Sequence, residues 1–201
     1  MIRLLLADDQ ALVRGALAAL LGLEPDLEVV AQVARGDEVL AAARVQPIDV
    51  ALLDVEMPGM DGIEVCRVLT EQMPHVRSMI VTTFGRPGFL RRAVEAGAGG
   101  FVVKDTPASE LAQAVRSVHA GLRVIDPTLA TESLLDGMNP LTEREQDVLR
   151  VAITGVPVSE IARRIHLSHG TVRNYLSSAI GKTHTTTRGE AAQVAQRRGW
   201  L

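Results

Sequence analysis

Acidic, hydroxyl and basic residues stand at the ends of several short apolar segments of this sequence. Each segment has the composition of a buried strand, and the polar residues at the carboxyl ends are Asp8, Asp9, Asp54, Thr82 and Lys104. The carboxyl ends of parallel strands meet at one edge of a sheet, where ligands gather. Three carboxylates at one edge repel one another unless a divalent cation or a lysine compensates, and all-oxygen ligands suit Mg²⁺. One acid beside a metal ion and Lys104 could then be a nucleophile toward a phosphoryl group.

Each of these residues, taken alone, also has an ordinary structural explanation. An aspartate after a strand usually caps a helix or begins a turn. Thr82 alone could be a strand residue, and Lys104 alone a solvated charge. Four strand ends in register that supply Asp-Asp, Asp, Thr and Lys would rarely arise by chance. The set therefore indicates a functional site, although none of its residues would do so alone.

The strands that would position these residues alternate with helical segments through residue 121. The predicted strands are Ile2–Ala7, Leu27–Val33, Ile48–Leu53, Met79–Thr82 and Gly100–Val103. The first and last helical segments carry apolar side chains every three to four residues, which gives each a stripe that packs on a sheet. The alternation predicts a doubly wound, five-stranded parallel α/β sheet.

The alternation of strands and helices stops after residue 121, which divides the chain into two domains and a linker. Residues 1–121 form the predicted α/β domain, residues 122–138 a linker, and residues 139–201 an all-helical domain. Thr142 and Glu145 make a capping box, which starts a helix that runs to Gly155. Three further helices are predicted to begin near Ser159, after Ser168 and after Thr187.

The two domains differ in charge. Residues 1–126 hold 12 Lys and Arg against 17 Asp and Glu, a net of −5, whereas residues 139–201 hold 9 against 5, a net of +4. Contacts to phosphates need Lys or Arg, so we expect a polyanionic partner to bind the C-terminal third of the chain.

The third helix of the C-terminal domain has one apolar and one polar face. Its polar face carries His169, Arg173, Asn174, Ser177 and Ser178. Arginine can contact guanine and asparagine can contact adenine in the major groove. An ordinary amphipathic surface helix would have the same pattern, but the preceding helix and the tight Leu167-Ser168 turn give a helix-turn-helix spacing.

No segment of the chain has the features of a membrane anchor. The longest apolar runs fall far short of a membrane span, and the chain enters its first strand without a signal peptide. The single cysteine, Cys66, fits a reducing compartment. We therefore expect a cytoplasmic protein without membrane insertion.

Residues 1–121 resemble the receiver domains of two-component response regulators. The stretches that carry the resemblance are Leu6-Ala7-Asp8-Asp9-Gln10, Asp54-Val55-Glu56-Met57-Pro58-Gly59-Met60-Asp61-Gly62, Val81-Thr82-Thr83 and Gly100-Phe101-Val102-Val103-Lys104. The resemblance implies a flavodoxin-like fold and a phosphoryl group that comes from a sensor histidine kinase.

The resemblance also implies a role for each residue of the set. Asp54 would be the phosphoacceptor, and Mg²⁺ would be bound by Asp9, Asp54 and the backbone carbonyl of Glu56, with Asp8 assisting. Thr82 and Lys104 would each bind a phosphoryl oxygen, and Phe101 would turn inward as the partner of Thr82 in the switch. Asp105 stands where many receivers have proline, and Phe101 lacks the hydroxyl of the more common tyrosine.

Residues 139–201 resemble the LuxR/NarL-type DNA-binding domain. The motifs are Leu141-Thr142-Glu143-Arg144-Glu145, Glu160-Ile161-Ala162, Leu167-Ser168 and Thr171-Val172-Arg173-Asn174-Tyr175, followed by Lys182 and Arg188. The resemblance implies that Arg173, Asn174 and Ser177 face bases, and that Thr171 and Lys182 contact phosphates. Gly181 and Thr183 depart from the family pattern, and because glycine costs about 1 kcal/mol in a helix the third helix is expected to fray early.

Within this family the chain resembles DesR-type regulators, through Thr82-Thr83-Phe84-Gly85-Arg86-Pro87-Gly88, Gly170-Thr171-Val172-Arg173-Asn174-Tyr175 and the Gly199-Trp200 ending. The resemblance implies a homodimer that forms on phosphorylation, through the first and last receiver helices near Val13 and residues 111–118. The dimer would bind an inverted repeat in a double-stranded DNA operator.

Two alternatives compete with a phosphorylated transcriptional regulator. Strand-end aspartates also build phosphohydrolases of the Asp-x-Asp type, but Asp54-Val55-Glu56 lacks the second aspartate, so we expect no enzyme beyond self-phosphorylation of Asp54. A degenerate receiver that only dimerises would not need the five site residues.

Overall fold

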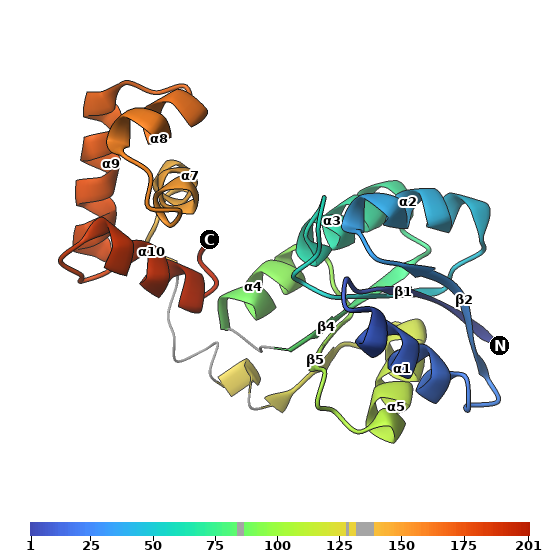
Figure 1. The fold of residues 1–201 in the computed structure, drawn as a ribbon. Coiled ribbons are helices and arrows are strands. Elements are labelled where there is room, and N and C mark those ends of the chain that lie inside the picture. The colour runs from blue at the N-terminus through green and yellow to red at the C-terminus, as the bar shows by residue number, and fades with distance from the viewer. Residues whose placement is uncertain (84–86, 128, 132–138) are drawn as a thin grey trace. The chain divides into compact units, whose positions relative to one another are not determined.

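The computed structural model describes residues 1–83, 87–127, 129–131 and 139–201. These residues form two compact units, one that spans most of residues 1–131 and one that contains residues 139–201 (Figure 1). Among the described residues, no helix combines the length and apolar character that crossing a bilayer requires.

The first unit is built on one parallel sheet. Its strands are β1 (Ile2–Ala7), β2 (Leu27–Val33), β3 (Val50–Leu53), β4 (Arg77–Thr82), β5 (Gly100–Val103) and β6 (Val124–Ile125). The strand order is β2-β1-β3-β4-β5-β6, so β1 lies between β2 and β3, where the direction of winding reverses.

Within the part of the chain that the structure describes, the sheet has one more strand than the sequence predicted. The five predicted strands are present, although β3 and β4 differ from the predicted ranges by two residues at their starts. The expected count of five is corrected to six because Val124 and Ile125, inside the segment predicted as a linker, pair with Gly100 and Phe101. A strand of two residues carries too little periodicity to be recognised in a sequence.

Helices cover both faces of the sheet (Figure 1). Helices α1 (Ala11–Leu21) and α5 (Ala108–His119) pack on one face, through side chains that include Leu21, Leu111 and Val115. Helices α2 (Gly36–Val45), α3 (Gly62–Gln72) and α4 (Pro87–Glu95) cover the other face. Both faces of the sheet are therefore buried, as the apolar composition of the strands predicted.

The second unit, over residues 139–201, consists of four helices around a small core. They are α7 (Glu143–Ala152), α8 (Val158–Arg164), α9 (His169–Lys182) and α10 (Arg188–Arg197). All four contribute to one apolar cluster, which also contains the buried side chain of Trp200. Trp200 is thus a packing residue of this core.

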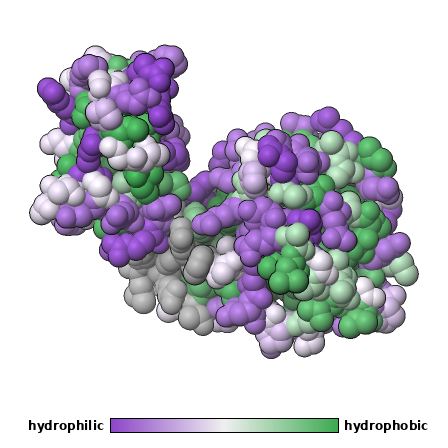
Figure 2. Space-filling model, viewed as in Figure 1, coloured by the Kyte–Doolittle hydropathy of each residue, from purple (hydrophilic) through white to green (hydrophobic). Residues whose placement is uncertain are grey.

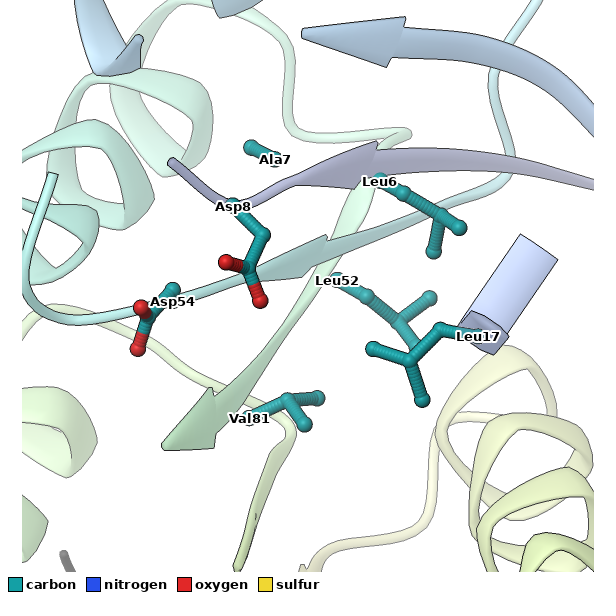
Figure 3. Close-up of a pocket in the computed structure, with 7 residues that line it drawn as sticks. All are labelled: Leu6, Ala7, Asp8, Leu17, Leu52, Asp54 and Val81. Carbon is teal, nitrogen blue, oxygen red and sulfur yellow. The ribbon is translucent and has the colours of Figure 1, made fainter. Parts of the chain in front are cut away.

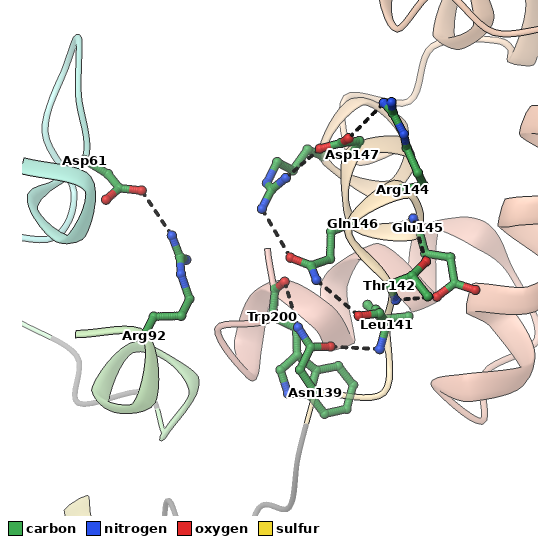
Figure 4. A network of polar contacts seen from close by, with 11 residues as sticks. Asp61, Arg92, Asn139, Leu141, Thr142, Arg144, Glu145, Gln146, Asp147 and Trp200 are labelled. Atoms are coloured by element: carbon green, nitrogen blue, oxygen red, sulfur yellow. Dashed lines mark hydrogen bonds and ion pairs between the residues drawn. The ribbon is translucent and has the colours of Figure 1, made fainter. Parts of the chain in front are cut away.

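Side-chain caps begin three of these helices where the sequence placed them. Thr142 and Glu145 form the complete capping box of α7, drawn in Figure 4, and Ser168 and Thr187 cap α9 and α10. Helix α8 begins one residue before Ser159, close to its expected start. Val158 already belongs to the helix and Pro157 stands at its N-cap position, so Ser159 does not cap it.

The expected early fraying of α9 is wrong. The helix continues through Gly181 to Lys182. Thr183, where the family usually has leucine, is buried, and its hydroxyl donates to the carbonyl of Ala179 at 2.8 Å. This bond gives the last turn of the helix an additional contact that the sequence pattern did not reveal.

Candidate functional site

Three aspartates converge at the carboxyl edge of the sheet. Asp8 follows β1 and Asp54 follows β3, the neighbouring strand, and both side chains are buried, whereas Asp9 is exposed. Ligand oxygens of the three carboxylates all lie within 4.8 Å of one another. An all-carboxylate set of this kind fits a hard divalent cation such as Mg²⁺.

Lys104 joins the two buried aspartates. Its ammonium lies 2.7 Å from Asp8 Oδ2 and 2.9 Å from Asp54 Oδ2. Burial raises the pKa of Asp54 above its ordinary value, and Lys104 counteracts part of that rise. Burial alone would lower the pKa of Lys104, but its bonds to Asp8 and Asp54 raise it above the usual lysine value. The lysine therefore stays charged and compensates the carboxylates.

Asp8 is held by more contacts than the sequence indicated. Asp8 Oδ1 accepts from the backbone N–H of Gln10 at 2.9 Å. The guanidinium of Arg14, one turn into α1, donates to the backbone carbonyl of Asp8. Sequence reasoning missed Arg14, although its position six residues after Asp8 in a helix that begins at the site could have suggested it.

The loop between β3 and α3 fixes the backbone of Asp54. The Asp54 N–H donates to the Ala7 carbonyl at 2.9 Å, and the Gly62 N–H donates to the Val55 carbonyl at 3.1 Å. A Cβ at position 62 would overlap the carbonyl oxygen of Asp54. Only glycine allows α3 to begin this close to Asp54.

The residues predicted to act as the switch lie on the two strands after β3. Thr82, at the end of β4, and Phe101, on β5, are both buried. Phe101 is 1% exposed and belongs to the cluster under α2, α3 and α4, so its ring points inward in this structure. Glu56 lies in the exposed loop after Asp54. Phe84, Gly85 and Arg86 lie outside the described residues.

A small pocket opens beside the acidic residues. Figure 3 shows Asp8 and Asp54 on one side of it and the side chains of Leu6, Leu52, Val81 and Leu17 on the other. The apolar residues come from the inner strands and from α1, which limits water around the carboxylates on that side. This pocket adjoins the acidic site and does not form a separate one.

The predicted DNA contacts lie along α9. Arg173, Asn174 and Ser177 are exposed on this helix. Its buried face carries Val172, Leu176 and Ala179, which pack in the core. The N–H of Thr171 donates to Ser168 Oγ at 3.1 Å, so Thr171 lies in the first turn of the helix. The structure thus leaves the polar face of α9 open, as expected for a recognition helix.

Lys182 has a partner within the domain. Its ammonium lies 2.7 Å from Glu145 Oε2 of α7. The sequence pointed to a phosphate contact for Lys182 and to a capping role alone for Glu145. Neither residue type nor spacing revealed the ion pair, because the partners are far apart in the chain.

Two family models match the chain over these two units. Residues 4–116 match the response regulator receiver domain, and residues 139–195 match the bacterial regulatory proteins of the LuxR family. The chain belongs to the response regulators that join a receiver domain to a LuxR-type DNA-binding domain. The two domains and the relatives make it a DNA-binding transcriptional regulator rather than a catalytic enzyme.

Its relatives have the same organisation. The chain is 43% identical to the uncharacterized transcriptional regulatory protein YvfU and 40% identical to the transcriptional regulatory protein DesR, both from Bacillus subtilis, over the full length of each. It is 36% identical to the DNA-binding transcriptional activator DevR/DosR of Mycobacterium tuberculosis, over 97% of this chain and 94% of that protein. The predicted resemblance to DesR-type regulators is confirmed.

Solved structures agree with this assignment. The response regulator ChrA of a heme-sensing two-component system is 30% identical, with a TM-score of 0.60 over 100% of this chain and 98% of that one. The response regulator RcsB in its DNA complex has a TM-score of 0.67 over 98% of both chains, and at 21% identity it supports the fold alone.

Proposed function

We propose that Asp54 is the phosphoacceptor of this regulator and that a sensor histidine kinase is the donor. The observation that carries the proposal is the placement of the Asp54 carboxylate beside Asp8 and Asp9, with the Lys104 ammonium at 2.9 Å. A carboxylate oxygen of Asp54 attacks phosphorus, the bond from phosphorus to the donor nitrogen breaks, and the leaving imidazole takes that electron pair.

The chain's own residues support this transfer through charge and position. Asp8, Asp9, Asp54 and the backbone carbonyl of Glu56 would hold Mg²⁺, which neutralises charge on the transferred group. Lys104 binds a phosphoryl oxygen once Asp54 is modified. The backbone bonds of the loop from Asp54 to Gly62 keep the acceptor in place.

We infer that Thr82 and Phe101 transmit the modification. Phosphorylation adds about −1.5 to −2 charges at Asp54. The Thr82 hydroxyl then moves to hydrogen-bond a phosphoryl oxygen, and Phe101 occupies the space that Thr82 leaves. The inward ring of Phe101 in this structure is compatible with that step.

We propose that the output is operator binding by a homodimer. Arg173, Asn174 and Ser177 face base edges in the major groove and Thr171 contacts a phosphate, whereas Lys182, which was expected to contact a phosphate, is held by Glu145. The net charge of +4 over residues 139–201 favours the polyanion, and the recognition helices of two copies would read an inverted repeat in double-stranded DNA. The protein would act in the cytoplasm, where it has access to DNA.

The phosphoacceptor is tested by intact-protein mass spectrometry after incubation with acetyl phosphate and Mg²⁺. The unchanged protein should gain one phosphoryl group, whereas Asp54→Ala should gain none. A chelator should likewise prevent labelling, since Lys104 alone cannot neutralise three carboxylates and a phosphate. Full labelling of Asp54→Ala would refute the assignment of Asp54.

The DNA contacts are tested by selection from a randomised duplex pool. Arg173→Ala should lose roughly 1–3 kcal/mol on the selected sequence and relax the preference at one symmetric position. A uniform loss of affinity with unchanged sequence preference would make Arg173 a phosphate contact and would contradict the proposed orientation of α9.

A further inference from the structure

Glu145 occupies a junction between α7 and α9 that the DNA contacts above do not involve. Its side chain is buried, with 3% of the residue exposed. Oε2 accepts from the Thr142 N–H and from the Lys182 ammonium, each at 2.7 Å, and Oε1 accepts from the Ser178 hydroxyl at 2.6 Å. One carboxylate therefore connects the start of α7 with the C-terminal half of the recognition helix.

The two partners on α9 define how this helix is rotated. Ser178 and Lys182 are one turn apart and lie on the side that faces Glu145. A buried carboxylate has lost its water and depends on its donors, so movement of either partner leaves it unsatisfied. Ser177 is adjacent to Ser178, and Asn174 lies one turn earlier on the helix. Any rotation of α9 that breaks the Glu145 contacts therefore also moves these residues.

We propose that Glu145 is a positioning residue for DNA recognition, acting through Ser178 and Lys182. The proposal rests on the proposed function of α9 in reading bases. It gives Lys182 a main role inside the domain, where it fixes the helix that carries the base contacts. It also explains why an acidic residue stands next to the DNA-binding helix of a domain whose net charge is positive.

The proposal and a simple phosphate contact by Lys182 predict different salt dependences. Each phosphate contact contributes about 0.9 to the slope of log affinity against log salt concentration. Loss of a phosphate contact lowers that slope and weakens binding to all sequences. Loss of a positioning contact leaves the slope unchanged and lowers the preference for the selected sequence.

The chain contains a matched control for Glu145. Glu190 occupies the same position in the capping box of α10, but it is exposed, and its carboxylate accepts from Thr186 and Thr187 in the turn before that helix. Glutamine preserves a capping box in place of glutamate. Glu145→Gln therefore removes the charge that holds Lys182 without removing the cap, and Glu190→Gln makes the same change away from α9.

The experiment measures binding of the phosphodonor-treated full-length protein over a range of salt concentrations. The probes are a duplex selected by the unchanged protein and a duplex of unrelated sequence. Glu145→Gln and Lys182→Met should each lower the preference for the selected duplex about tenfold, the cost of one misplaced base contact, with an unchanged salt slope. Glu190→Gln should retain the preference. The double variant should lose no more than either single variant, because both changes break one interaction.

Several outcomes would overturn the proposal. Retained preference in Glu145→Gln, or a slope that falls by about 0.9 in Lys182→Met with no change in preference, would make Lys182 a phosphate contact only. If Glu145→Gln does not fold, Ser178→Ala replaces it. That variant leaves the carboxylate and Lys182 in place and should show a smaller loss of preference, and an unchanged preference would refute the positioning role.

A wrong assignment of α9 as the helix that reads bases would give a different result from a wrong role for Glu145. Arg173→Ala is measured alongside, and if it too leaves the preference unchanged, α9 does not read bases and the proposed function is wrong. If Arg173→Ala loses the preference while Glu145→Gln and Ser178→Ala keep it, the proposed function stands and the positioning role of Glu145 fails.

Discussion

Lys104 is the residue on which the charge balance of the acidic site depends. Its ammonium and the carboxylates of Asp8 and Asp54 are each less than 10% exposed, so water contributes little to their solvation. Removing one partner of a buried ion pair leaves an uncompensated charge. The lysine is therefore a structural counter-ion as well as a candidate ligand of the phosphoryl group.

We expect Lys104→Met to lower the free energy of unfolding of the receiver domain by about 3 kcal/mol in the absence of divalent cations. Mg²⁺ should restore more stability to this variant than to the unchanged protein, because the cation replaces the lost charge. Urea unfolding followed by far-UV circular dichroism, with and without Mg²⁺, measures both effects.

Arg35→Met is the control for this prediction. Arg35 pairs with Asp37 at 2.8 Å, but both side chains are nearly half exposed, and such surface pairs contribute about 0 to 1 kcal/mol. Equal destabilisation by Lys104→Met and Arg35→Met would contradict the importance assigned to burial at the acidic site.

Glu145 gives the C-terminal domain a defined response to acid. Burial opposes its ionisation, but the bonds from Lys182, Ser178 and Thr142 outweigh burial and lower the pKa of Glu145 to about 2. A carboxyl whose pKa is lower in the folded state contributes stability that is complete above its unfolded pKa, about 4.3 to 4.5. That contribution disappears as the pH falls toward the folded pKa.

We expect the unchanged protein to lose about 3 kcal/mol more than Glu145→Gln between pH 5 and pH 2, since each pKa unit corresponds to about 1.4 kcal/mol. The measurement is urea unfolding followed by fluorescence, because Trp200 and Tyr175 both lie in the C-terminal domain. Parallel pH profiles for the two proteins would show that the ionisation of Glu145 is not linked to folding.

At the scale of elements, the approach of α3 to the end of β3 determines the backbone around Asp54. Gly62 begins α3 against the Asp54 carbonyl, and its N–H bonds to Val55. Asp61 caps the same helix by accepting from the Glu64 N–H at 2.7 Å. The position of the phosphoacceptor thus depends on a helix that begins within eight residues of it.

We expect Gly62→Ala to destabilise the receiver domain by about 2 kcal/mol and to slow labelling of Asp54 by acetyl phosphate, because the added methyl group displaces the loop. Gly15→Ala is the matched control. A Cβ at position 15 in α1 meets no atom within 4 Å, so alanine there should stabilise the helix by up to about 1 kcal/mol and leave labelling unchanged. If Gly62→Ala is stable and is labelled at the normal rate, the close approach of α3 to the Asp54 carbonyl is not required for phosphorylation.

At the scale of the whole molecule, burial decides which side chains of the expected dimer surface could contact a second copy. The expected surface lies on α1 near Val13 and on α5 over residues 111–118. Within it, Leu111, Val115 and Val118 are at most 3% exposed because they pack on the sheet. Leu12, by contrast, is 86% exposed on α1. Hydrophobic side chains reach the surface of this region in Figure 2. The side chains of this surface that remain available to a second copy are those on the outer faces of α1 and α5, such as Leu12 and Gln113.

We expect phosphorylation to shift the protein from monomer to dimer in sedimentation velocity, and we expect Leu12→Glu to keep the phosphorylated protein monomeric. A charge buried at an interface without a partner opposes association. Val45→Glu on α2 is the control, since Val45 is 78% exposed on the opposite face of the sheet and should not affect dimerisation. Identical mass distributions for the free and phosphorylated protein would remove dimerisation as the switch.

The sequence by itself determined the elements and the identity of the acidic site. Strands and helices have different periods, and the carboxyl ends of parallel strands meet at one edge, so Asp8, Asp54 and Lys104 were predictable as neighbours from their positions after strands. The caps at Thr142, Ser168 and Thr187 were predictable because a cap and its helix are adjacent in the chain. Local patterns of this kind need no knowledge of how distant segments pack.

The tertiary structure decided every contact between distant segments. It paired Lys104 with Asp8 as well as Asp54, added Val124 and Ile125 to the sheet, and joined Glu145 to Ser178 and Lys182 more than thirty residues away. Such contacts depend on how far apart the helices and strands lie and how each is rotated. Sequences with the same apolar periodicity can pack their elements with different rotations and separations. The polar face of α9 could be predicted from spacing alone, whereas the contacts that hold that face in position required the packed core.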